Sequence, residues 1–200
     1  PKRKRKTVHS MDTHGLMDLD YERIGPAGRL FKRAFTDPLV NWVLPAGFMR
    51  WILKVARSEL AQASWANPGG WRSMVLSYCE DTPPQITDRL LIKLGSIPIA
   101  LRNRRKLATE ILTRMIRDRA GQRTNLVCLG AGPGMICLEA VHRADHADCH
   151  AYLIDLNPDS FEFGRKLAQS KGLDGRVRFI HGDVTHYRTL CDATPHIVKM

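Results

Sequence analysis

The apolar positions in the first 120 residues recur with helical spacing. A first stripe consists of Phe48, Trp51, Ile52 and Val55. A second stripe consists of Leu107, Ile111, Leu112, Met115 and Ile116. Gly121 follows the second stripe, as a helix stop should, and the spacings predict mostly helical structure over residues 21–120. Because amphipathic helices usually bury such stripes, we expect the aromatic stripe to pack against its own domain.

Residues 121–200 have a different pattern, in which short apolar runs alternate with helical ones. The predicted strands span 125–129, 150–154, 176–180 and 196–200, and the predicted helices span 135–143 and 159–171. Strands that alternate with helices through short loops are typical of a parallel α/β sheet. The fold class that we expect is therefore α/β, with an incomplete parallel sheet of about four strands preceded by a helical segment.

The first 20 residues are expected to form a flexible basic tail. Pro1-Lys-Arg-Lys-Arg-Lys6 is a block of like charges, which repel one another and stay solvated. The block resembles a nuclear localisation signal, but we favour the plainer interpretation of a solubilising arm or a cloning remnant. The predicted organisation is a tail over 1–20, a helical segment over 21–120 and an α/β domain over 121–200.

The net charge of +11 is carried by the front of the chain. Basic residues outnumber acidic ones by 12 to 6 in residues 1–60 and by 11 to 5 in residues 61–125, whereas residues 126–200 hold 8 basic and 9 acidic side chains. A basic front suits the phosphates of nucleic acid or the headgroups of an anionic membrane. One alternative function is therefore a non-catalytic adaptor that binds either partner through its N-terminal half.

Composition and cysteine usage exclude several classes of protein. Hydrophobic residues make up 44% and charged residues 26% of the chain, which is typical of a soluble globular protein. No uncharged run reaches the roughly 20 residues that a transmembrane helix needs. No secretory signal follows the basic N-terminus. The five cysteines are odd in number and never spaced as C-x-x-C, so we expect buried thiols in a cytoplasmic protein, or a nuclear one if the basic block is a targeting signal.

A glycine turn joins the first predicted strand of the α/β domain to the helix that follows. Its sequence is Gly130-Ala-Gly-Pro-Gly134. Glycine allows positive φ and lets a ligand lie against bare backbone. The following helix presents unpaired N–H groups and the positive end of its dipole to such a ligand. In open α/β sheets, ligands bind beyond the carboxyl ends of the strands, where this turn falls.

Two acidic residues follow the next two predicted strands at the same edge. Asp155 ends the second strand about 20 residues after the turn, where a carboxylate can accept hydrogen bonds from both ribose hydroxyls. Asp183 follows the third strand, where a carboxylate can accept a hydrogen bond from an adenine amino group. Three strands thus each supply one element of a nucleoside site.

With these residues identified, the chain resembles the front half of the class I S-adenosylmethionine-dependent methyltransferases. The resemblance covers residues 125–199 and rests on three motifs, Leu129-Gly-Ala-Gly-Pro-Gly134, Asp155-Leu-Asn-Pro158 and Gly182-Asp-Val184. It implies a Rossmann-like sheet, S-adenosyl-L-methionine as cofactor, and transfer of a methyl group to a nucleophile.

The resemblance also implies roles for individual residues. The backbone of the glycine turn would hold the methionine part of the cofactor, Asp155 the ribose and Leu156 the adenine, with Asp183 at the adenine edge. The expected cofactor-binding residues are Gly130, Ala131, Gly132, Gly134, Asp155, Leu156, Asp183 and Val184. Catalytic residues are not identified, and no metal is expected. By analogy with the family, the helical segment caps the pocket of an acceptor that is a small molecule or a lipid.

Two features depart from the family pattern. Cys128 stands two positions before the first glycine, where many members carry an acidic residue. The family's sheet also has more strands than this chain supplies, so we interpret the chain as a fragment or a truncated product. If the family's strand order holds, the fourth strand lies beside the first and leaves an open edge that favours self-association or pairing with a partner chain.

Two further alternatives arise from the α/β domain. An NAD-dependent oxidoreductase also uses a glycine turn, but its fingerprint is G-x-G-x-x-G, whereas Met135 leaves the third glycine one place early and favours the methyltransferase. His142, His146 and His150 are spaced four apart and would share a metal only on one continuous helix. Because the chain must lead into a strand at His150, we expect solvated loop histidines instead.

Overall fold

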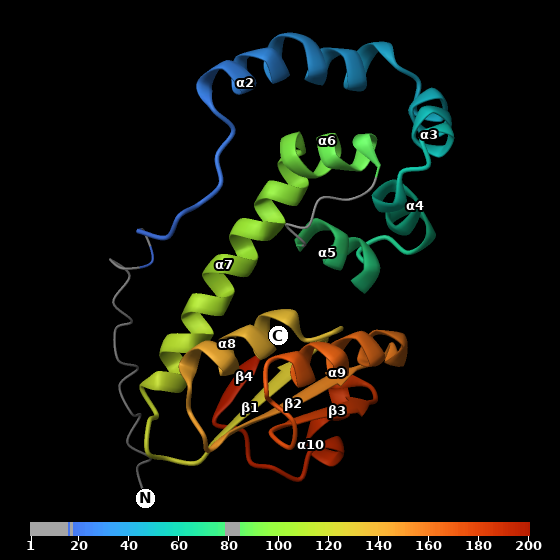
Figure 1. Cartoon of the computed structure of the whole chain (residues 1–200). Helices are drawn as coiled ribbons and strands as arrows, with labels where there is room; N and C mark the ends of the chain where they lie inside the picture. The colour runs from blue at the N-terminus through green and yellow to red at the C-terminus, as the bar shows by residue number, and fades with distance from the viewer. Residues whose placement is uncertain (1–15, 17, 79–84) are drawn as a thin grey trace, which may run out of the picture.

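A computed structural model of the chain describes residue 16, residues 18–78 and residues 85–200 (Figure 1). The predicted basic tail lies almost entirely outside the described residues. Within them, a layer of helices precedes a four-stranded parallel sheet that is flanked by helices. The predicted α/β fold class is therefore confirmed.

The helical segment is a succession of helices with two π-helical turns near its start. Its elements are α2 (Pro26–Phe31), η1 (Lys32–Thr36), η2 (Leu39–Val43), α3 (Ala46–Val55), α4 (Glu59–Ala66), α5 (Trp71–Tyr78), α6 (Ile86–Leu94) and α7 (Ser96–Arg117). Ser58 caps α4, because its hydroxyl accepts a hydrogen bond from the N–H of Ala61 at 3.1 Å. Helix α7 runs diagonally from the helical layer to the sheet (Figure 1).

The α/β domain supplies the strands and helices that the sequence predicts, each within two residues of its predicted bounds. Its elements are β1 (Thr124–Leu129), α8 (Met135–Ala144), β2 (Cys149–Asp155), η3 (Pro158–Ser160), α9 (Phe161–Ser170), β3 (Val177–His181), η4 (Val184–His186), α10 (Tyr187–Leu190) and β4 (Ile197–Lys199). The strands pair in parallel in the order β3-β2-β1-β4. Leu126 of β1 lies opposite Ala151 of β2 and Ile197 of β4, so the fourth strand lies beside the first, as expected.

Helices α7, α8 and α9 cover one face of the sheet. The core on this face includes Leu112, Ile116, Leu126, Leu138, Val141, Leu153, Ala168, Leu173 and Ile197. Leu126, Leu138 and Leu153 have no exposed surface. Burial of each such side chain contributes about 1.5–3 kcal/mol. This core therefore fixes α7 on the sheet and, through α7, orients the helical layer above it.

The opposite face of the sheet carries a smaller apolar cluster. Val127 and Ile154 pack there against Cys191, which follows α10. Successive strand residues point to opposite faces, and on this face Val198 of β4 is 46% exposed. The cluster is thus covered at the centre of the sheet and open at β4.

An ion pair ties the start of the described chain to α7. The buried Arg102 guanidinium donates to both carboxylate oxygens of Glu22, at 2.9 and 2.7 Å, and to the carbonyl of Ile92 at 3.0 Å. Asn103 makes two hydrogen bonds to the backbone of Glu22, at 2.8 and 2.9 Å. The hydrogen bond from Arg102 holds the pKa of Glu22 below its usual value, which keeps this pair charged.

The structure contradicts the expectation that the aromatic stripe is buried. Residues 26–55, from α2 through α3, form an N-terminal arm that crosses the top of the molecule in Figure 1. Most of its described large apolar side chains are exposed, among them Leu30 (71%), Phe31 (62%), Phe35 (64%), Trp42 (88%) and Trp51 (59%), whereas Ile52 of the stripe is half-buried. Helical spacing predicts which face of a helix is apolar, but it does not supply the surface that covers that face.

The cysteines differ in part from the buried thiols that the sequence predicts. Cys128 at the end of β1 and Cys137 in α8 form a disulfide, because this strand and this helix pack directly on one another. Cys149 and Cys191 are free and buried, as expected. Burial raises the pKa of the Cys149 thiol to about 11, so this thiol stays neutral near pH 7.

Candidate functional site

The glycine turn joins β1 to α8 at the carboxyl edge of the sheet. Gly130, Gly132 and Gly134 have φ angles of +61°, +53° and +75°. Glycine adopts this left-handed region without strain. The N–H of Ala131 donates to the carbonyl of Ile154 at 3.1 Å, which ties the turn to the end of β2. The glycine spacing therefore follows from the backbone path between strand and helix.

Gly134 is required by packing as well as by its φ angle. A Cβ atom at this position would lie 2.5 Å from Cδ1 of Leu153, a fully buried residue of β2. Gly134 is also the N-cap residue of α8, directly before Met135. The absence of a side chain thus lets the N-terminus of α8, with its unpaired N–H groups, start directly at the sheet edge.

Asp155 holds the turn through its carboxylate. Its Oδ2 accepts a hydrogen bond from the N–H of Gly132 at 2.7 Å, and its Oδ1 accepts one from the N–H of Asn157 at 2.8 Å. A carboxylate offers about four acceptor positions, so the side chain can still bind a ligand. Cys128, two positions before the first glycine, offers no carboxylate to the turn, and Asp155 anchors it.

A cavity of about 580 Å³ opens between the turn and the helical layer. From the sheet edge it is lined by Gly130, Ala131, Gly132, Gly134 and Asp155. From the helices it is lined by Trp71, Met74, Val75, Tyr78, Arg104 and Ala108. This volume lies within the roughly 300–1,000 Å³ of sites for small molecules. The structure therefore brings five of the eight predicted cofactor-binding residues together in one concave site.

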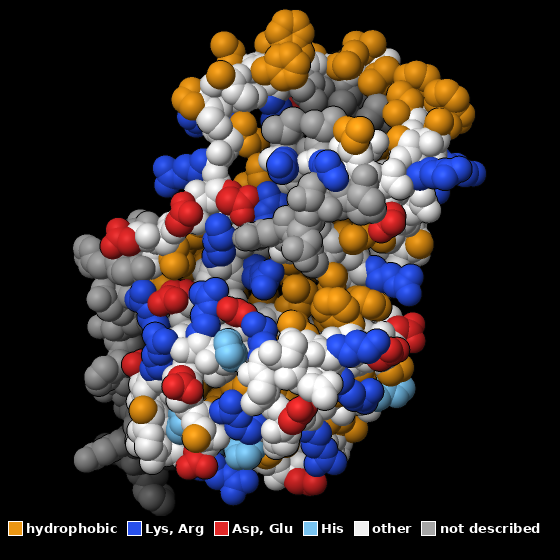
Figure 2. All heavy atoms as spheres, viewed as in Figure 1, with side chains coloured by type: hydrophobic (Ala, Val, Ile, Leu, Met, Phe, Trp, Pro, Cys, Tyr) orange, Lys and Arg blue, Asp and Glu red, His pale blue; other side chains and the backbone are white. Residues whose placement is uncertain are grey.

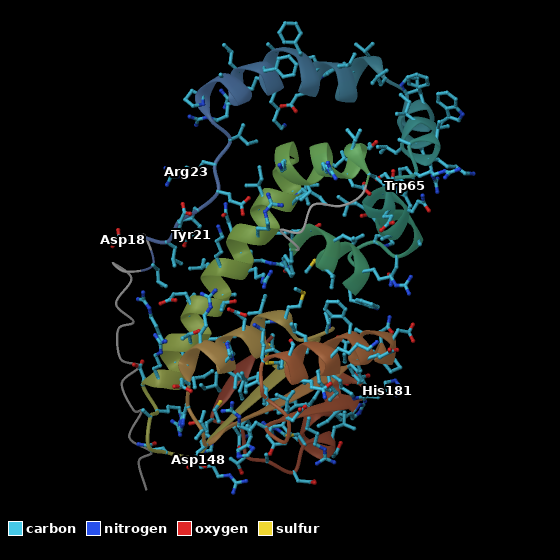
Figure 3. All side chains as sticks on the ribbon, viewed as in Figure 1. Asp18, Tyr21, Arg23, Trp65, Asp148 and His181 are labelled. Atoms are coloured by element: carbon cyan, nitrogen blue, oxygen red, sulfur yellow. A yellow bond between two sulfur atoms is a disulfide. The ribbon has the colours of Figure 1, made fainter. Side chains whose placement is uncertain are left out.

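Leu156 lies beside this cavity and not in its lining. Its side chain is 62% exposed, and its carbonyl oxygen lies 3.1 Å from Nε2 of His181. Figure 3 shows His181 at the carboxyl edge of the sheet and Asp148 at the opposite edge. Leu156 thus presents an apolar side chain to solvent next to Asp155, on the side of the site that faces β3.

Asp183 and Val184 also lie outside the cavity lining. Oδ1 of Asp183 accepts hydrogen bonds from the N–H and the hydroxyl of Thr185, both at 2.8 Å. The bond from the backbone N–H, followed by that from the hydroxyl, lowers the pKa of the exposed Asp183 carboxyl. The side chain of Val184 packs against the cluster of Val127 and Ile154. In this structure Asp183 therefore caps η4, and the side chain of Val184 belongs to the core.

The sequence analysis missed the side of the cavity that the helical segment supplies. Trp71 begins α5 directly after the turn that ends at Gly70. The sequence signal for this side of the cavity was the turn Asn-Pro-Gly-Gly followed by an aromatic residue. Arg104 lies on α7, with Nη2 3.1 Å from the hydroxyl of Tyr78. Lys199 reaches the cavity from β4. The positions of these cations depend on packing between distant elements, which residue spacing does not reveal.

The three histidines considered as metal ligands have different surroundings. His142 is exposed on α8, and His150 lies in β2. His146 is buried and not solvated as expected, with Nε2 2.9 Å from the carbonyl of Gln122. Within residues 18–78 and 85–200, no cluster of three or more His, Cys, Asp or Glu side chains is arranged to hold a metal ion.

The chain is similar to several known proteins. The model of a family described as "Putative methyltransferase" matches residues 90–198. An RNA methyltransferase from Salinibacter ruber, solved in complex with S-adenosyl-L-homocysteine, is 28% identical over 38% of this chain and 49% of that chain, with a TM-score of 0.32. An O-methyltransferase family protein from Burkholderia thailandensis is 17% identical over 70% of this chain and 41% of that chain, with a TM-score of 0.39. No curated protein matches the chain.

The present chain spans half or less of the length of these two solved proteins. The family match, however, runs from α6 to β4 and covers more than half of the chain. It includes the glycine turn, Asp155, Asp183 and the first three strands of the sheet, and it ends within β4. The chain belongs to this family of putative methyltransferases.

Proposed function

We propose that this chain binds S-adenosyl-L-methionine at the glycine turn and serves the transfer of its methyl group to a small-molecule or lipid acceptor. The observation that supports this proposal most directly is the cavity that the glycine turn and Asp155 share with α5 and α7. The sheet edge supplies nucleoside-binding chemistry, and the helices supply an aromatic and apolar wall. One cavity therefore has room for a donor and for part of an acceptor.

The described residues fit the adenosyl group. The turn offers bare backbone at Gly130 and Gly132, and no neighbouring atom lies within 4 Å of where a Cβ of Gly130 would stand. Asp155 can keep its bond to the N–H of Gly132 and still accept hydrogen bonds from ribose hydroxyls. The exposed side chain of Leu156 is available to pack on the adenine, and Asp183 lies beyond it after β3.

When bound, the cofactor supplies an electrophilic methyl group. Transfer of such a group requires in-line alignment of donor and acceptor, and enzymes achieve this mainly by positioning. In this proposal the turn and Asp155 fix the donor, while Trp71, Met74 and Tyr78 hold the acceptor and exclude water from the opposite side. The proton that an O–H or N–H acceptor loses passes to a base or to solvent.

Calorimetric titration with S-adenosylhomocysteine tests this proposal. We expect micromolar binding by the unchanged chain and at least about 10-fold weaker binding by Asp155→Asn, since a charged hydrogen bond contributes about 1.5–3 kcal/mol. Asp174→Asn, an exposed loop residue remote from the turn, serves as the matched control and should bind normally. Titration with NAD tests the alternative that the chain is an oxidoreductase. A folded chain that binds NAD, or neither ligand, would contradict the proposal.

We infer a second function for the N-terminal arm, which is contact with an anionic membrane surface. Figure 2 shows hydrophobic side chains gathered over the arm, at the top of the view. Residues 26–55 carry five Arg or Lys side chains and one Asp. Exposed aromatic residues beside cations suit the boundary between headgroups and acyl chains. Among the described helices, none is both long and apolar enough to cross a bilayer, so the proposed contact lies on the surface.

Vesicle sedimentation tests this second function. We expect binding to phosphatidylglycerol vesicles, little binding to phosphatidylcholine vesicles, and loss of binding in a Trp42→Ser, Trp51→Ser double variant. Ile97→Ser, which removes an exposed apolar side chain from α7 outside the arm, is the control. The nucleic-acid alternative predicts instead salt-sensitive binding to duplex DNA that the double variant retains.

A further inference from the structure

Two cations in the cavity have no acidic partner among the described residues. Arg104 of α7 and Lys199 of β4 both line the cavity, and neither side chain forms an ion pair with a carboxylate of residues 18–78 or 85–200. Asp155 has the only side-chain carboxylate among the described lining residues, and it already accepts two backbone hydrogen bonds. Two positive charges that share a partly enclosed space favour an anion between them.

Contacts with α5 hold the Arg104 guanidinium at the cavity wall. Its Nη2 donates to the hydroxyl of Tyr78 at 3.1 Å and lies 3.9 Å from the sulfur of Met74. Because the hydroxyl of Tyr78 accepts this bond, its own proton is left to donate to a ligand. The ring of Tyr78 is buried, and Arg105 stacks over it at 5.6 Å. The guanidinium and the tyrosine hydroxyl therefore form a fixed pair of donors.

Lys199 approaches the same space from the sheet. It lies in β4, in register with Cys128 of β1, two residues before the glycine turn begins. Burial lowers the pKa of the Lys199 ammonium, and the charge of Arg104 lowers it further. An anion between the two cations would remove this repulsion and compensate the burial.

The strand order locates the anion at one end of the cavity. Asp183 follows β3 and Asp155 ends β2, so the nucleoside side of the proposed donor site lies over that half of the sheet. Lys199 lies across β1, on the far side of the glycine turn. The methyl group and its acceptor are therefore expected on the side where the two cations stand.

We propose that Arg104 and Lys199 form a subsite for a carboxylate or phosphate of the methyl acceptor, with the hydroxyl of Tyr78 as a third donor. This inference rests on the proposed function and narrows the acceptor class to anionic molecules whose apolar part packs on Trp71 and Met74. The amino-acid end of the cofactor is a poorer match, because its ammonium group would be repelled by both cations.

The test uses a charged and an uncharged probe on the full chain saturated with S-adenosylhomocysteine. Phenyl phosphate and benzoate represent the two anions, and benzyl alcohol represents the same ring without charge. We expect the chain to bind at least one anion and to bind benzyl alcohol much more weakly. Arg104→Met and Lys199→Met should each weaken anion binding about 10- to 100-fold. Lys93→Met, which removes an exposed charge from α6, should leave it unchanged.

Cofactor titrations of the same variants separate the possible sources of the anion. The proposal requires that both variants bind S-adenosylhomocysteine within about twofold of the unchanged chain. If they lose this binding but keep that of methylthioadenosine, which lacks the carboxylate, the cations serve the cofactor and the proposal is wrong. The proposal would also be wrong if Arg104→Met and Lys199→Met each bound phenyl phosphate and benzoate as tightly as the unchanged chain does. If the unchanged chain does not bind S-adenosylhomocysteine, the proposed function fails, and the anion titrations on the cofactor-free chain still decide whether the subsite exists.

Discussion

At Gly134 two separate constraints act on a single residue. The φ angle of +75° disfavours any side chain, and the close approach to Leu153 leaves no space for one. We expect Gly134→Ala to lower the free energy of unfolding by about 2–5 kcal/mol, since a left-handed residue costs about 1–2 kcal/mol and overpacking about 1–3 kcal/mol. Urea denaturation of the two proteins measures this difference.

Gly172 provides the matched control for Gly134. Its φ angle is +66°, and no atom lies within 4 Å of the place where its Cβ would stand. Gly172→Ala should therefore lose only the conformational contribution of about 1–2 kcal/mol. If Gly134→Ala and Gly172→Ala lost equal stability, the close approach of Leu153 would not be a reason why position 134 requires glycine.

At the scale of elements, Glu139 links α8 to the end of α9. Its carboxylate accepts hydrogen bonds from Arg143, one turn later, and from Lys171, each at 2.6 Å. Burial on its own would raise the pKa of Glu139, but the bonds from Lys171 and Arg143 outweigh it and lower the pKa to about 2. A folded pKa below the unfolded one stabilises the protein above about pH 4.5, and this contribution is lost as the pH falls towards 2.

We therefore expect Glu139→Gln to destabilise the chain by about 1–3 kcal/mol at pH 7. The gap between variant and unchanged chain should shrink steadily between pH 4.5 and 2.5 in thermal or urea unfolding. Glu162→Gln is the control, because Glu162 and Lys166 are spaced four residues apart, as Glu139 and Arg143 are, but form an exposed pair. This variant should change stability little at any pH. A gap for Glu139→Gln that does not depend on pH would contradict the assignment.

The elements also show what could be predicted from the sequence. The strands were found because buried parallel strands form continuous apolar runs, as in Asn125–Leu129. The glycine turn and Asp155 were found because each lies at a fixed distance from the end of such a run. Trp71, Arg104 and Lys199 were not found as site residues, because they reach the cavity only when α7 packs on α8 and β4 pairs with β1.

The aromatic stripe of the N-terminal arm shows a second limit of prediction from the sequence. Its period correctly predicts α3, yet Phe48, Trp51 and Val55 are exposed. A hydrophobic period records that a face is apolar, whereas burial depends on a second surface that the sequence of the helix does not describe. The assignment of this arm to a lipid surface therefore rests on the cations beside the stripe and not on the period itself.

At the scale of the whole molecule, β4 is the edge strand of the described sheet, next to β1 only. Its outer edge presents N–H and C=O groups, and Val198 adds an exposed apolar side chain. We expect the 200-residue chain to self-associate weakly through this edge. Size-exclusion chromatography with light scattering at several dilutions should show an apparent mass that rises with concentration.

Two variants distinguish the sheet edge from the N-terminal arm as the surface that associates. Val198→Lys places a charge on the edge strand without touching the buried Ile197, so it should shift the chain towards monomer. Thr194→Lys adds the same charge at an exposed position before β4 and should have no such effect. If only the Trp42→Ser, Trp51→Ser variant becomes monomeric, the arm is the contact and the edge is not. A chain that is monomeric at every concentration would show that three residues of β4 are too short an edge to recruit a partner.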